Sequence, residues 1–436
     1  MNDTIAAIAT AQGVGGVAVV RVSGEKALET VCRYFNAGKT LSVRHATYGT
    51  FSDGEKSVDD VVVTYYKAPN SYTGEDVVEI SCHGSSYIQR EILKVLIDNG
   101  CRMAERGEFT KRAFLNGKMD LAQAEAVADL IGAKGKAVHR IAMAQMKGNV
   151  SERLRELRSK LVELAALVEL ELDFSDHEDV VFADREKLGE TAEAIKHEIE
   201  RLRRSFSQGN AIKNGIPVAI VGEPNVGKST LINRLVGDDC AIVSDIAGTT
   251  RDTIEREVDI DGVMFRFVDT AGIRESDDQI ERLGIERSRR AIEKAKVVVL
   301  LTEKGVKGDI VGELRDGQKL IVCENKTDVG RCSGKFLGIS ALTGDNVDEL
   351  KHRIYEAGVG DEMEDVTITN ARHYEALGRG LEDIVRVIDG LNSGVETDLV
   401  AEDLRGCLFH LGEICGDEVT ADEVLGTIFE RFCIGK

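Results

Sequence analysis

Gly222-Glu223-Pro224-Asn225-Val226-Gly227-Lys228-Ser229 stands between an apolar run at 217–221 and a helical pattern at 230–235. This octapeptide matches GxxxxGK[ST], a loop whose backbone N–H groups enclose phosphate oxygens at the start of a helix. From 217 to about 357, strand and helix patterns alternate, which predicts a parallel sheet with helices on its faces. The sequence therefore predicts a P-loop nucleotide-binding domain over residues 216–358. Its expected phosphate contacts are Asn225, Val226, Gly227, Lys228, Ser229 and Thr230, with Ser229 also binding Mg²⁺.

Two further motifs predict which base the domain selects. Asn325-Lys326-Thr327-Asp328 follows the apolar run 320–323, and Ser340-Ala341-Leu342 follows a fourth predicted strand. The Asp328 carboxylate can accept hydrogen bonds from both N1–H and the 2-amino group of guanine, whereas adenine offers no such pair of donors. The sequence therefore predicts that the domain binds GTP rather than ATP.

The remaining motifs concern the metal and the γ-phosphate. Asp269-Thr270-Ala271-Gly272 follows the predicted strand 264–268, which places a carboxylate at a strand end near the metal's water shell. Thr250, within Gly248-Thr249-Thr250-Arg251-Asp252, is expected to bind Mg²⁺ and the γ-phosphate through its hydroxyl. Together the five motifs occur in the order and approximate spacing of a Ras-like G domain.

The position after Gly272 leaves the source of catalysis open. Many G proteins place a glutamine there to orient the attacking water, but this chain has Ile273, whose aliphatic side chain cannot do so. Arg251 and Arg274 are candidates for an arginine finger, although surface arginines are common and the structural interpretation is favoured for each. Another group must position the water and balance the charge that grows between the β- and γ-phosphates.

The composition is that of a globular protein with several domains. The chain has 436 residues, of which 42% are hydrophobic and 30% are charged, and this length divides into roughly three domains. No run approaches the ~18 apolar residues that cross a membrane, and the start lacks the basic segment of a signal peptide, so a cytoplasmic location without membrane contact is expected. The nine cysteines include no CxxC pair, which argues against disulfides and structural zinc. Because the net charge is −20, any RNA must be bound by a local basic patch or through a partner.

Patterns outside the G domain divide the rest of the chain. Residues 1–118 are expected to form a compact α+β domain. Its strand candidates are 16–22, 60–66 and 76–80, and its helix candidates are 24–36 and 86–99. From about 119 the pattern becomes helical. Apolar residues at steps of three and four indicate one long helix that packs against a neighbour: Leu154, Leu157, Leu161, Leu164 and Val168.

A second helical run, about 182–207, is expected to end before Gly209, Asn214 and Gly215. After 365 the sequence is helical again. We therefore expect 119–212 and 365–436 to form one discontinuous all-α domain into which the G domain is inserted, as is tolerated when a domain's ends lie close together.

Five stretches carry a resemblance to a known family. They are Val20-Arg21-Val22-Ser23-Gly24, Asn70-Ser71-Tyr72-Thr73-Gly74-Glu75-Asp76, Arg106-Gly107-Glu108-Phe109-Thr110, Ala113-Phe114-Leu115-Asn116-Gly117-Lys118 and Phe432-Cys433-Ile434-Gly435-Lys436. With the G domain, they make the whole chain closely resemble the bacterial and organellar tRNA uridine 5-carboxymethylaminomethylation GTPases. The run at 70–76 and the terminal Cys-Ile-Gly-Lys are specific to that family, whereas the G motifs alone are not. The resemblance implies a folate-binding N-terminal domain, a discontinuous helical domain and an inserted G domain.

The resemblance also implies an activity and partners. In that family the N-terminal domains form a homodimer, and a partner that depends on FAD and NADH joins it in a heterotetramer. The complex adds a carboxymethylaminomethyl group to C5 of the wobble uridine of certain tRNAs. Tetrahydrofolate, as the 5-formyl or methylene form, supplies the one-carbon unit, and glycine or ammonium supplies the nitrogen. The G domains of a dimer meet when GTP is bound, and K⁺ accelerates hydrolysis.

Residue roles follow from the resemblance, position by position. The cations of the folate set suit that ligand's glutamate tail, and the carboxylate suits the donors of its pterin: Arg21, Glu79, Lys118 and Lys436. The family's K⁺ ligands fall on the Asn225 side chain and on the carbonyls of Ser244, Ile246 and Thr249. Ser244 and Thr249 also count among the GTP-binding residues. The water-positioning glutamate falls on Glu281, and Cys433 is equally consistent with a reactive and an inert thiol.

Two other classes of protein share such a G domain. A ribosome-assembly GTPase usually appends a basic RNA-binding domain, whereas the end of this chain is rich in acidic residues, as in Asp417-Glu418 and Asp422-Glu423. A switch whose hydrolysis only times an assembly step is the second alternative. Folate binding separates both from the tRNA-modification hypothesis, because only that hypothesis requires it. A G domain coupled to membrane iron transport is excluded because no segment reads as membrane-spanning.

Overall fold

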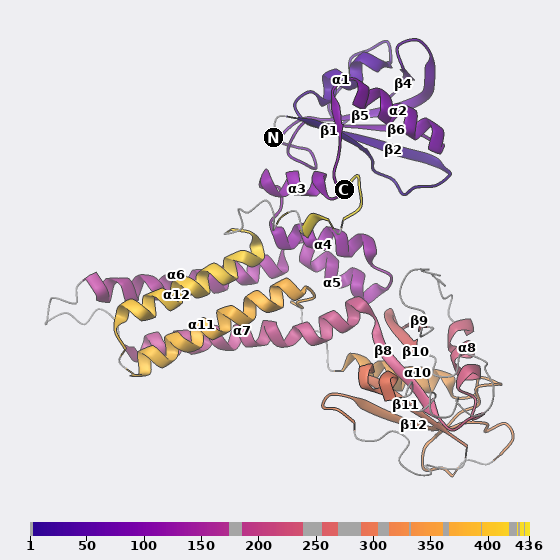
Figure 1. The fold of residues 1–436 in the computed structure, drawn as a ribbon, viewed down its shortest axis with the longest axis vertical. Coiled ribbons are helices and arrows are strands. Elements are labelled where there is room, and N and C mark those ends of the chain that lie inside the picture. The colour runs from indigo at the N-terminus through magenta and orange to yellow at the C-terminus, as the bar shows by residue number, and fades with distance from the viewer. Residues whose placement is uncertain are drawn as a thin grey trace. The chain divides into compact units, whose positions relative to one another are not determined.

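The computed structural model describes residues 3–173, 185–238, 255–268, 289–303, 314–330, 333–360, 366–393, 395–417, 425, 428–430 and 432–436. The chain forms two compact units, coloured by residue number in Figure 1. Unit 1 comprises Met1–Ile131, Gln145–Asp184 and Ser393–Lys436, and unit 2 comprises Gly132–Ala144 and Arg185–Asn392. The domain boundaries expected from the sequence stay predictions.

Unit 1 contains a seven-stranded sheet in the order β3-β4-β5-β6-β2-β1-β7, antiparallel except where β1 pairs with β7. Its strands are β1 (Thr4–Ile8), β2 (Gly15–Ser23), β3 (Phe35–Asn36), β4 (Thr47–Ser52), β5 (Ser57–Tyr66), β6 (Val77–Gly84) and β7 (Cys101–Met103). Two helices, α1 (Ala27–Tyr34) and α2 (Ser86–Asp98), bury their apolar faces with the sheet in one core. The three predicted strands and two predicted helices are confirmed within a few residues, whereas β1, β3, β4 and β7 were not predicted.

Four further helices belong to unit 1. They are α3 (Glu108–Leu115), α4 (Leu121–Gly132), α6 (Asn149–Asp173) and α12 (Thr397–Cys415). The leucine and valine stripe predicted between 154 and 168 is buried, and α6 lies along α12 (Figure 1). Phe429 and Phe432 share a buried cluster with Leu121 of α4, so the C-terminal segment packs beside the start of that helix.

Unit 2 contains a six-stranded sheet in the order β13-β12-β11-β8-β10-β9, parallel except for the β9–β10 hairpin. Its strands are β8 (Ile216–Gly222), β9 (Glu255–Ile260), β10 (Val263–Val268), β11 (Val297–Thr302), β12 (Lys319–Glu324) and β13 (Leu337–Gly338). Every residue of β11 is buried, as is typical of a central parallel strand covered on both faces.

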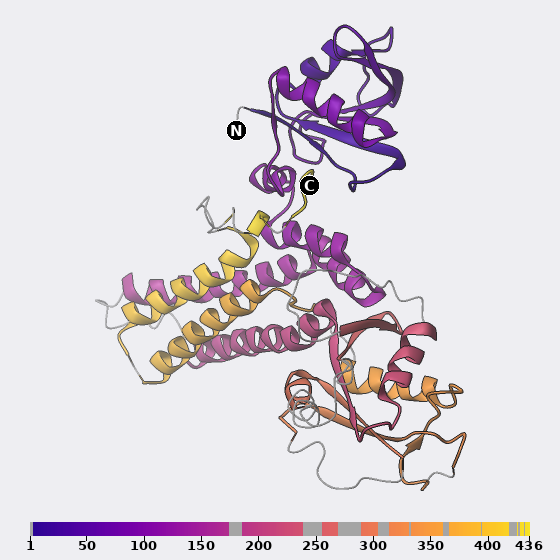
Figure 2. The same cartoon turned by 45° about the vertical axis from the view of Figure 1, so that its right-hand side comes forward.

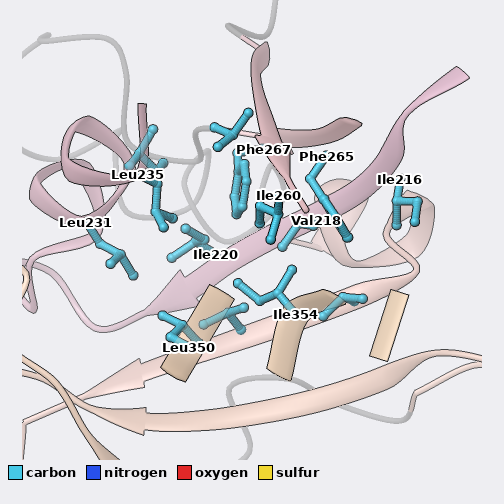
Figure 3. Close-up of a cluster of buried hydrophobic side chains, with 14 of the residues drawn as sticks. Ile216, Val218, Ile220, Leu231, Leu235, Ile260, Phe265, Phe267, Leu350 and Ile354 are labelled. Atoms are coloured by element: carbon cyan, nitrogen blue, oxygen red, sulfur yellow. The ribbon is translucent and has the colours of Figure 1, made fainter. Parts of the chain in front are cut away.

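The core of this sheet holds α8 (Lys228–Asp238) and α10 (Val347–Val359) against the strands. Figure 3 shows Ile220 of β8 near Leu231 of α8, with Leu350 and Ile354 of α10 in the same cluster. The predicted α/β architecture of the P-loop domain is confirmed.

Three more helices lie wholly or mainly in unit 2. They are α5 (Lys136–Met146), α7 (Arg185–Asn214) and α11 (Ala371–Ser393). Figure 2 shows α7 and α11 side by side, and the rings of Phe206 and Tyr374 stack between them with centroids 4.5 Å apart. Among the described residues, no helix combines the length and apolarity needed to span a membrane.

The predicted end of the second helical run is wrong, because α7 continues through Gly209 to Asn214. A Cβ atom at 209 would lie 2.4 Å from the carbonyl oxygen of Ile368. Glycine therefore lets the segment before α11 approach the helix backbone, and Ile368 N–H donates to Ser205 Oγ at 3.0 Å one turn earlier. The glycine serves packing here and does not end the helix.

Candidate functional site

The P-loop joins the end of β8 to the first turn of α8. The Lys228 ammonium donates to the carbonyl oxygens of Gly222 and Glu223, each at 2.9 Å, and so lies against the loop. Asn225 is exposed in a left-handed conformation with φ of 62°, and Ser229 and Thr230 are exposed at the start of α8. Backbone N–H groups, an ammonium and hydroxyls are the donors that suit phosphate, and a serine hydroxyl suits Mg²⁺.

Asn325 connects the P-loop to the predicted guanine motif. Its buried side chain donates from Nδ2 to the Val226 carbonyl at 2.7 Å and accepts at Oδ1 from Ala341 N–H at 2.9 Å. A Cβ atom at 227 would lie 2.3 Å from Asn325 Nδ2, so only glycine permits this approach. One amide therefore holds together three motifs that are more than 100 residues apart at their ends.

The carboxylate of Asp328 is oriented by a neighbouring hydroxyl. Ser340 Oγ donates to Asp328 Oδ1 at 2.7 Å, and Thr327 N–H donates to the Ile339 carbonyl at 3.2 Å. Lys326 lies in a left-handed conformation with φ of 68°, which turns the chain after Asn325. Its ammonium pairs with Glu303. The structure thus brings the 325–328 and 340–342 segments into contact at the carboxyl ends of β12 and β13.

Several predicted residues lie outside the described residues. They are Ser244, Ile246, Thr249, Thr250, Asp269, Thr270, Ala271, Gly272 and Glu281, together with Arg251, Ile273 and Arg274. Asp269 follows Val268 directly in the sequence, and Val268 ends a strand that pairs with β8. The roles predicted for these residues therefore stay predictions.

A second group of functional candidates lies in unit 1. Arg21 of β2 and Glu79 of β6 are opposite each other in the sheet register, and the guanidinium contacts Glu79 Oε1 at 2.9 Å from Nε and 2.8 Å from Nη2. The Arg21 guanidinium also lies over the rings of Tyr72 and Phe109, at 5.2 and 5.6 Å from their centroids. Arg21 is thus held in a fixed orientation, with 14% of its side chain exposed.

The C-terminal segment meets the same group. Arg21 Nη1 donates to the Gly435 carbonyl at 3.4 Å, and Gly107 N–H donates to the Cys433 carbonyl at 3.4 Å. Burial, and next the positive charge of Arg21, lowers the pKa of the Lys436 ammonium, while Glu79 opposes that effect. Arg21, Glu79 and Lys436 therefore come together from positions that are far apart in the sequence.

The side chains of Lys118 and Cys433 have different surroundings from the side chain of Arg21. The Lys118 ammonium donates to the Pro69 carbonyl at 3.0 Å and is exposed, so it contacts the loop that carries Tyr72 rather than Arg21 itself. Cys433 is exposed and unpaired with another cysteine.

Sequence reasoning missed the polar network that supports this group. Ser23, two residues after Arg21 on β2, contacts Thr73 Oγ1 at 2.7 Å and donates to Glu75 Oε2 at 2.8 Å. The loop that carries Tyr72 is thereby tied to the strand that carries Arg21. No local pattern marks these hydroxyls, although Thr73 and Glu75 lie in the run at 70–76 that carries the resemblance.

A buried arginine extends the network to α3 and to the N-terminal segment. Arg112 is 1% exposed and donates to Glu75, to Asp3 Oδ1 at 2.7 Å and to Glu108 Oε1 at 3.1 Å. Burial alone would raise the pKa of Glu108, but hydrogen bonds from Arg102 and the Glu105 backbone outweigh it, so the pKa is lowered. The spacing of Glu108 and Arg112 was a visible signal, because residues four apart on a helix are neighbours.

This network predicts a pH-dependent loss of stability. A lowered folded-state pKa means that Glu108 stabilises the fold above its unfolded value, near 4.5, and that this contribution disappears as the pH falls. Glu108→Gln should therefore cost roughly 1.5–3 kcal/mol at pH 7, the range for a hydrogen bond to a charged group, and progressively less as the pH falls below 4.5 and through the lowered pKa of Glu108. Urea unfolding at neutral and at acidic pH gives the two costs, and hydrogen exchange in the α3 peptides follows the same change locally.

The matched control is Glu29→Gln, because Glu29 and Arg33 form an exposed pair four residues apart on α1. It should change stability by a few tenths of a kcal/mol at either pH. A cost of Glu108→Gln that stays constant as the pH falls below 4.5 and through the lowered pKa would contradict the electrostatic role of Glu108.

Comparisons with family models and curated relatives cover nearly the whole chain. The family model of the GTP-binding protein TrmE N-terminus matches residues 4–118, and that of the MnmE helical domain matches residues 121–433. The chain is 49% identical to a tRNA modification GTPase MnmE of Parabacteroides distasonis and 48% identical to one of Bacteroides thetaiotaomicron, with 100% of both chains covered in each case. Among solved structures, it is similar to the G domain of the T. maritima FeoB iron transporter, with 24% identity over 33% of this chain and 98% of that chain and a TM-score of 0.24, which is too low to add to the assignment. The chain belongs to the MnmE family of tRNA modification GTPases.

Proposed function

We propose that this chain binds and hydrolyses GTP and uses that cycle in modifying C5 of the wobble uridine of certain tRNAs. The observation that carries the proposal is the Asn325 side chain, which joins the P-loop to the loop that holds Asp328 and Ser340. The proposed domains are 1–118 for folate and dimerisation, 216–358 for GTP, and 119–212 with 365–436 for the helical part. The proposed location is the cytoplasm.

The proposed nucleotide contacts follow the motifs. Residues 225–230 hold the phosphates, Asp328 reads the guanine edge, and 340–342 complete the base pocket. The Ser229 hydroxyl, exposed at the helix start, and Thr250 hold Mg²⁺, which neutralises charge on the β- and γ-phosphates. Asp269 to Gly272 respond to the γ-phosphate. The exposed Ser229 hydroxyl and the left-handed conformation of Asn225 in the loop support this assignment.

We propose K⁺ as the charge that replaces an arginine finger. The Asn225 side chain is exposed on the P-loop, where it can serve as one oxygen ligand, and the carbonyls of Ser244, Ile246 and Thr249 complete the set. Glu281 positions the attacking water, because Ile273 offers no polar group. A cation held there supplies positive charge beside the phosphates.

We propose that the group formed by Arg21, Glu79 and Lys436 binds the folate. A guanidinium fixed between a carboxylate and two aromatic rings, with an ammonium at Lys436, offers the cations and the acceptor that the ligand's tail and pterin require. Lys118 approaches from the 69–76 loop. A calorimetric titration with 5-formyl-tetrahydrofolate tests this: binding supports the tRNA-modification function, and its absence favours a ribosome-assembly GTPase or an assembly-timing switch.

Partners complete the proposal. They are a second copy through the N-terminal domain, a partner dependent on FAD and NADH in a heterotetramer, and tRNA. The exposed side chains of Tyr48 and Val62, opposite each other on β4 and β5, support self-association, since they leave apolar surface on that sheet face. The net charge of −20 supports a division of labour in which the flavin partner supplies part of the tRNA-binding surface.

Removing the terminal segment tests its part in folate binding. Deletion of residues 433–436 should weaken binding of 5-formyl-tetrahydrofolate by tenfold or more, because it removes the Lys436 ammonium and the Gly435 carbonyl that orients Arg21. A charge-assisted contact contributes about 1.5–3 kcal/mol, which corresponds to about tenfold or more in affinity.

GTP affinity, measured on the same deletion protein, is the internal control and should not change. Equal folate affinity with and without the four residues would remove Lys436 from the site.

A further inference from the structure

A short segment of the chain leaves unit 1 and packs within unit 2. Residues 132–144 belong to unit 2, although the chain before them, in α4, and after them, from Gln145 at the end of α5, belongs to unit 1. The segment therefore crosses from one unit to the other and back. The sequence patterns assign it to the helical part, so its packing partner is a finding of the structure.

The packing partner is the β9–β10 hairpin. Ala137 N–H donates to the Gly262 carbonyl at 2.9 Å, and the Lys134 ammonium contacts the two Glu257 carboxylate oxygens at 2.8 and 3.1 Å. Ala137, Val138 and Ile141 are buried in the same cluster as the hairpin residues, including Ile260 and Val263. The segment is thus bound through backbone, charge and apolar contacts together.

The two backbones touch at glycines. Gly262 has φ of 83°, and a Cβ atom there would lie 2.8 Å from Lys136 Cβ. From the other side, a Cβ atom at Gly135 would lie 2.9 Å from the Gly262 carbonyl oxygen. A side chain on either glycine would therefore separate the segment from the turn. The close approach therefore depends on glycine at both positions.

The hairpin links two nucleotide-sensing stretches of sequence. It begins at Glu255, five residues after Thr250, and ends at Val268, directly before Asp269. Its strands are paired from Val263 with Ile260 to Val268 with Glu255, without a register shift. In GTPases the stretches that contact the γ-phosphate and Mg²⁺ rearrange on hydrolysis, and a paired hairpin between them transmits such a change as one body.

We propose that residues 132–144 are a strap through which the guanine nucleotide in unit 2 alters unit 1. The presence or absence of the γ-phosphate sets the position of the β9–β10 hairpin. The strap, which is packed on the hairpin, moves with it and displaces α4, to which it is covalently joined. The inference rests on the proposed GTP binding. It adds a coupling element, made of residues that touch no ligand, to that function.

Hydrogen exchange on the full-length chain tests the strap. The protein is saturated with GDP or with guanosine 5′-(β,γ-imido)triphosphate, in Mg²⁺ and KCl, and binding of each nucleotide is first measured by calorimetry. Exchange in peptides covering 132–144 and α4 should differ between the two states by about fivefold or more, the lower end of ordinary allosteric couplings.

Gly262→Ala should remove that difference in α4 while leaving nucleotide binding in place, because the added Cβ separates the turn from Lys136. The matched control is Gly317→Ala. Gly317 also has φ of 83°, but no atom of the described residues would lie within 4 Å of a Cβ added there, so this variant tests backbone strain alone. The control should keep the nucleotide-dependent difference of the wild type.

A charge exchange provides a second variant that leaves the turn intact. Lys134→Glu and Glu257→Lys should each reduce the difference in α4, and the double variant should restore it, since the pair is rebuilt with reversed charges.

The outcomes separate this inference from the proposed function. If neither nucleotide binds, the proposed function fails and the strap fails with it. If both bind but α4 exchanges identically in the two states, only the strap is overturned. A nucleotide-dependent difference that survives unchanged in Gly262→Ala also overturns it.

Discussion

GTP hydrolysis by this chain should be faster in KCl than in NaCl at equal ionic strength, by up to about 10³-fold. An arginine finger accelerates hydrolysis by about 10³–10⁵, and a K⁺ beside the phosphates should supply a comparable part of that charge compensation. Oxygen ligands in a wide cage suit the larger ion, which is why Na⁺ should replace it poorly. Steady-state phosphate release in the two salts gives the ratio.

Two substitutions divide the roles of cation and water. Asn225→Ala should lose most of the acceleration by K⁺, because it removes the side-chain ligand from the exposed loop. Glu281→Ala should be slow in either salt and should still bind GTP, because it removes the group that positions the water.

Asn346→Ala is the matched control for Asn225→Ala. Asn346 is also exposed and left-handed, with φ of 57° against 62° for Asn225, but it is the N-cap residue of α10 and is not part of the P-loop. It should keep the response to K⁺. Equal rates in both salts for the unmodified chain would refute the role of K⁺, and a fully active Glu281→Ala would leave the water without an identified partner.

Asp328→Asn should weaken GTP binding about tenfold to more than a hundredfold, and xanthosine triphosphate should become competitive. The substitution replaces one acceptor of the carboxylate with an amide that donates, and a bidentate contact to a base edge is worth about 1–3 kcal/mol. Ser340 Oγ orients the carboxylate at 2.7 Å, so the loss should fall on base recognition rather than on folding of the loop. Competition titrations with both nucleotides measure the switch.

Asp345→Asn is the matched control, because Asp345 follows the 340–342 segment that contacts Asp328 and also accepts a hydrogen bond from a hydroxyl, Thr343 Oγ1 at 2.8 Å. It should leave the preference for GTP unchanged. GTP binding that is unaffected in Asp328→Asn would contradict the assignment of the guanine contact.

The sequence by itself determined the elements that depend on local order. The P-loop, the alternation of strands and helices after 217 and the apolar stripe of α6 are confirmed, because phosphate loops and buried faces follow from the spacing of nearby residues. The grouping of Arg21, Glu79 and Lys436 came only from the resemblance to a family, and the structure brings those three side chains together.

Only the tertiary structure decided the contacts between distant segments. Gly209 stays inside a helix because of what approaches it from Ile368, the polar network around Arg112 joins three separate segments, and the strap at 132–144 packs on the β9–β10 hairpin. A glycine reads the same in the sequence whether it ends a helix or admits a neighbouring backbone. The difference lies in the contacting segment, which is more than 100 residues away at Ile368. The spacing of apolar residues cannot predict that contact, because it indicates only which face of its own helix or strand a residue occupies.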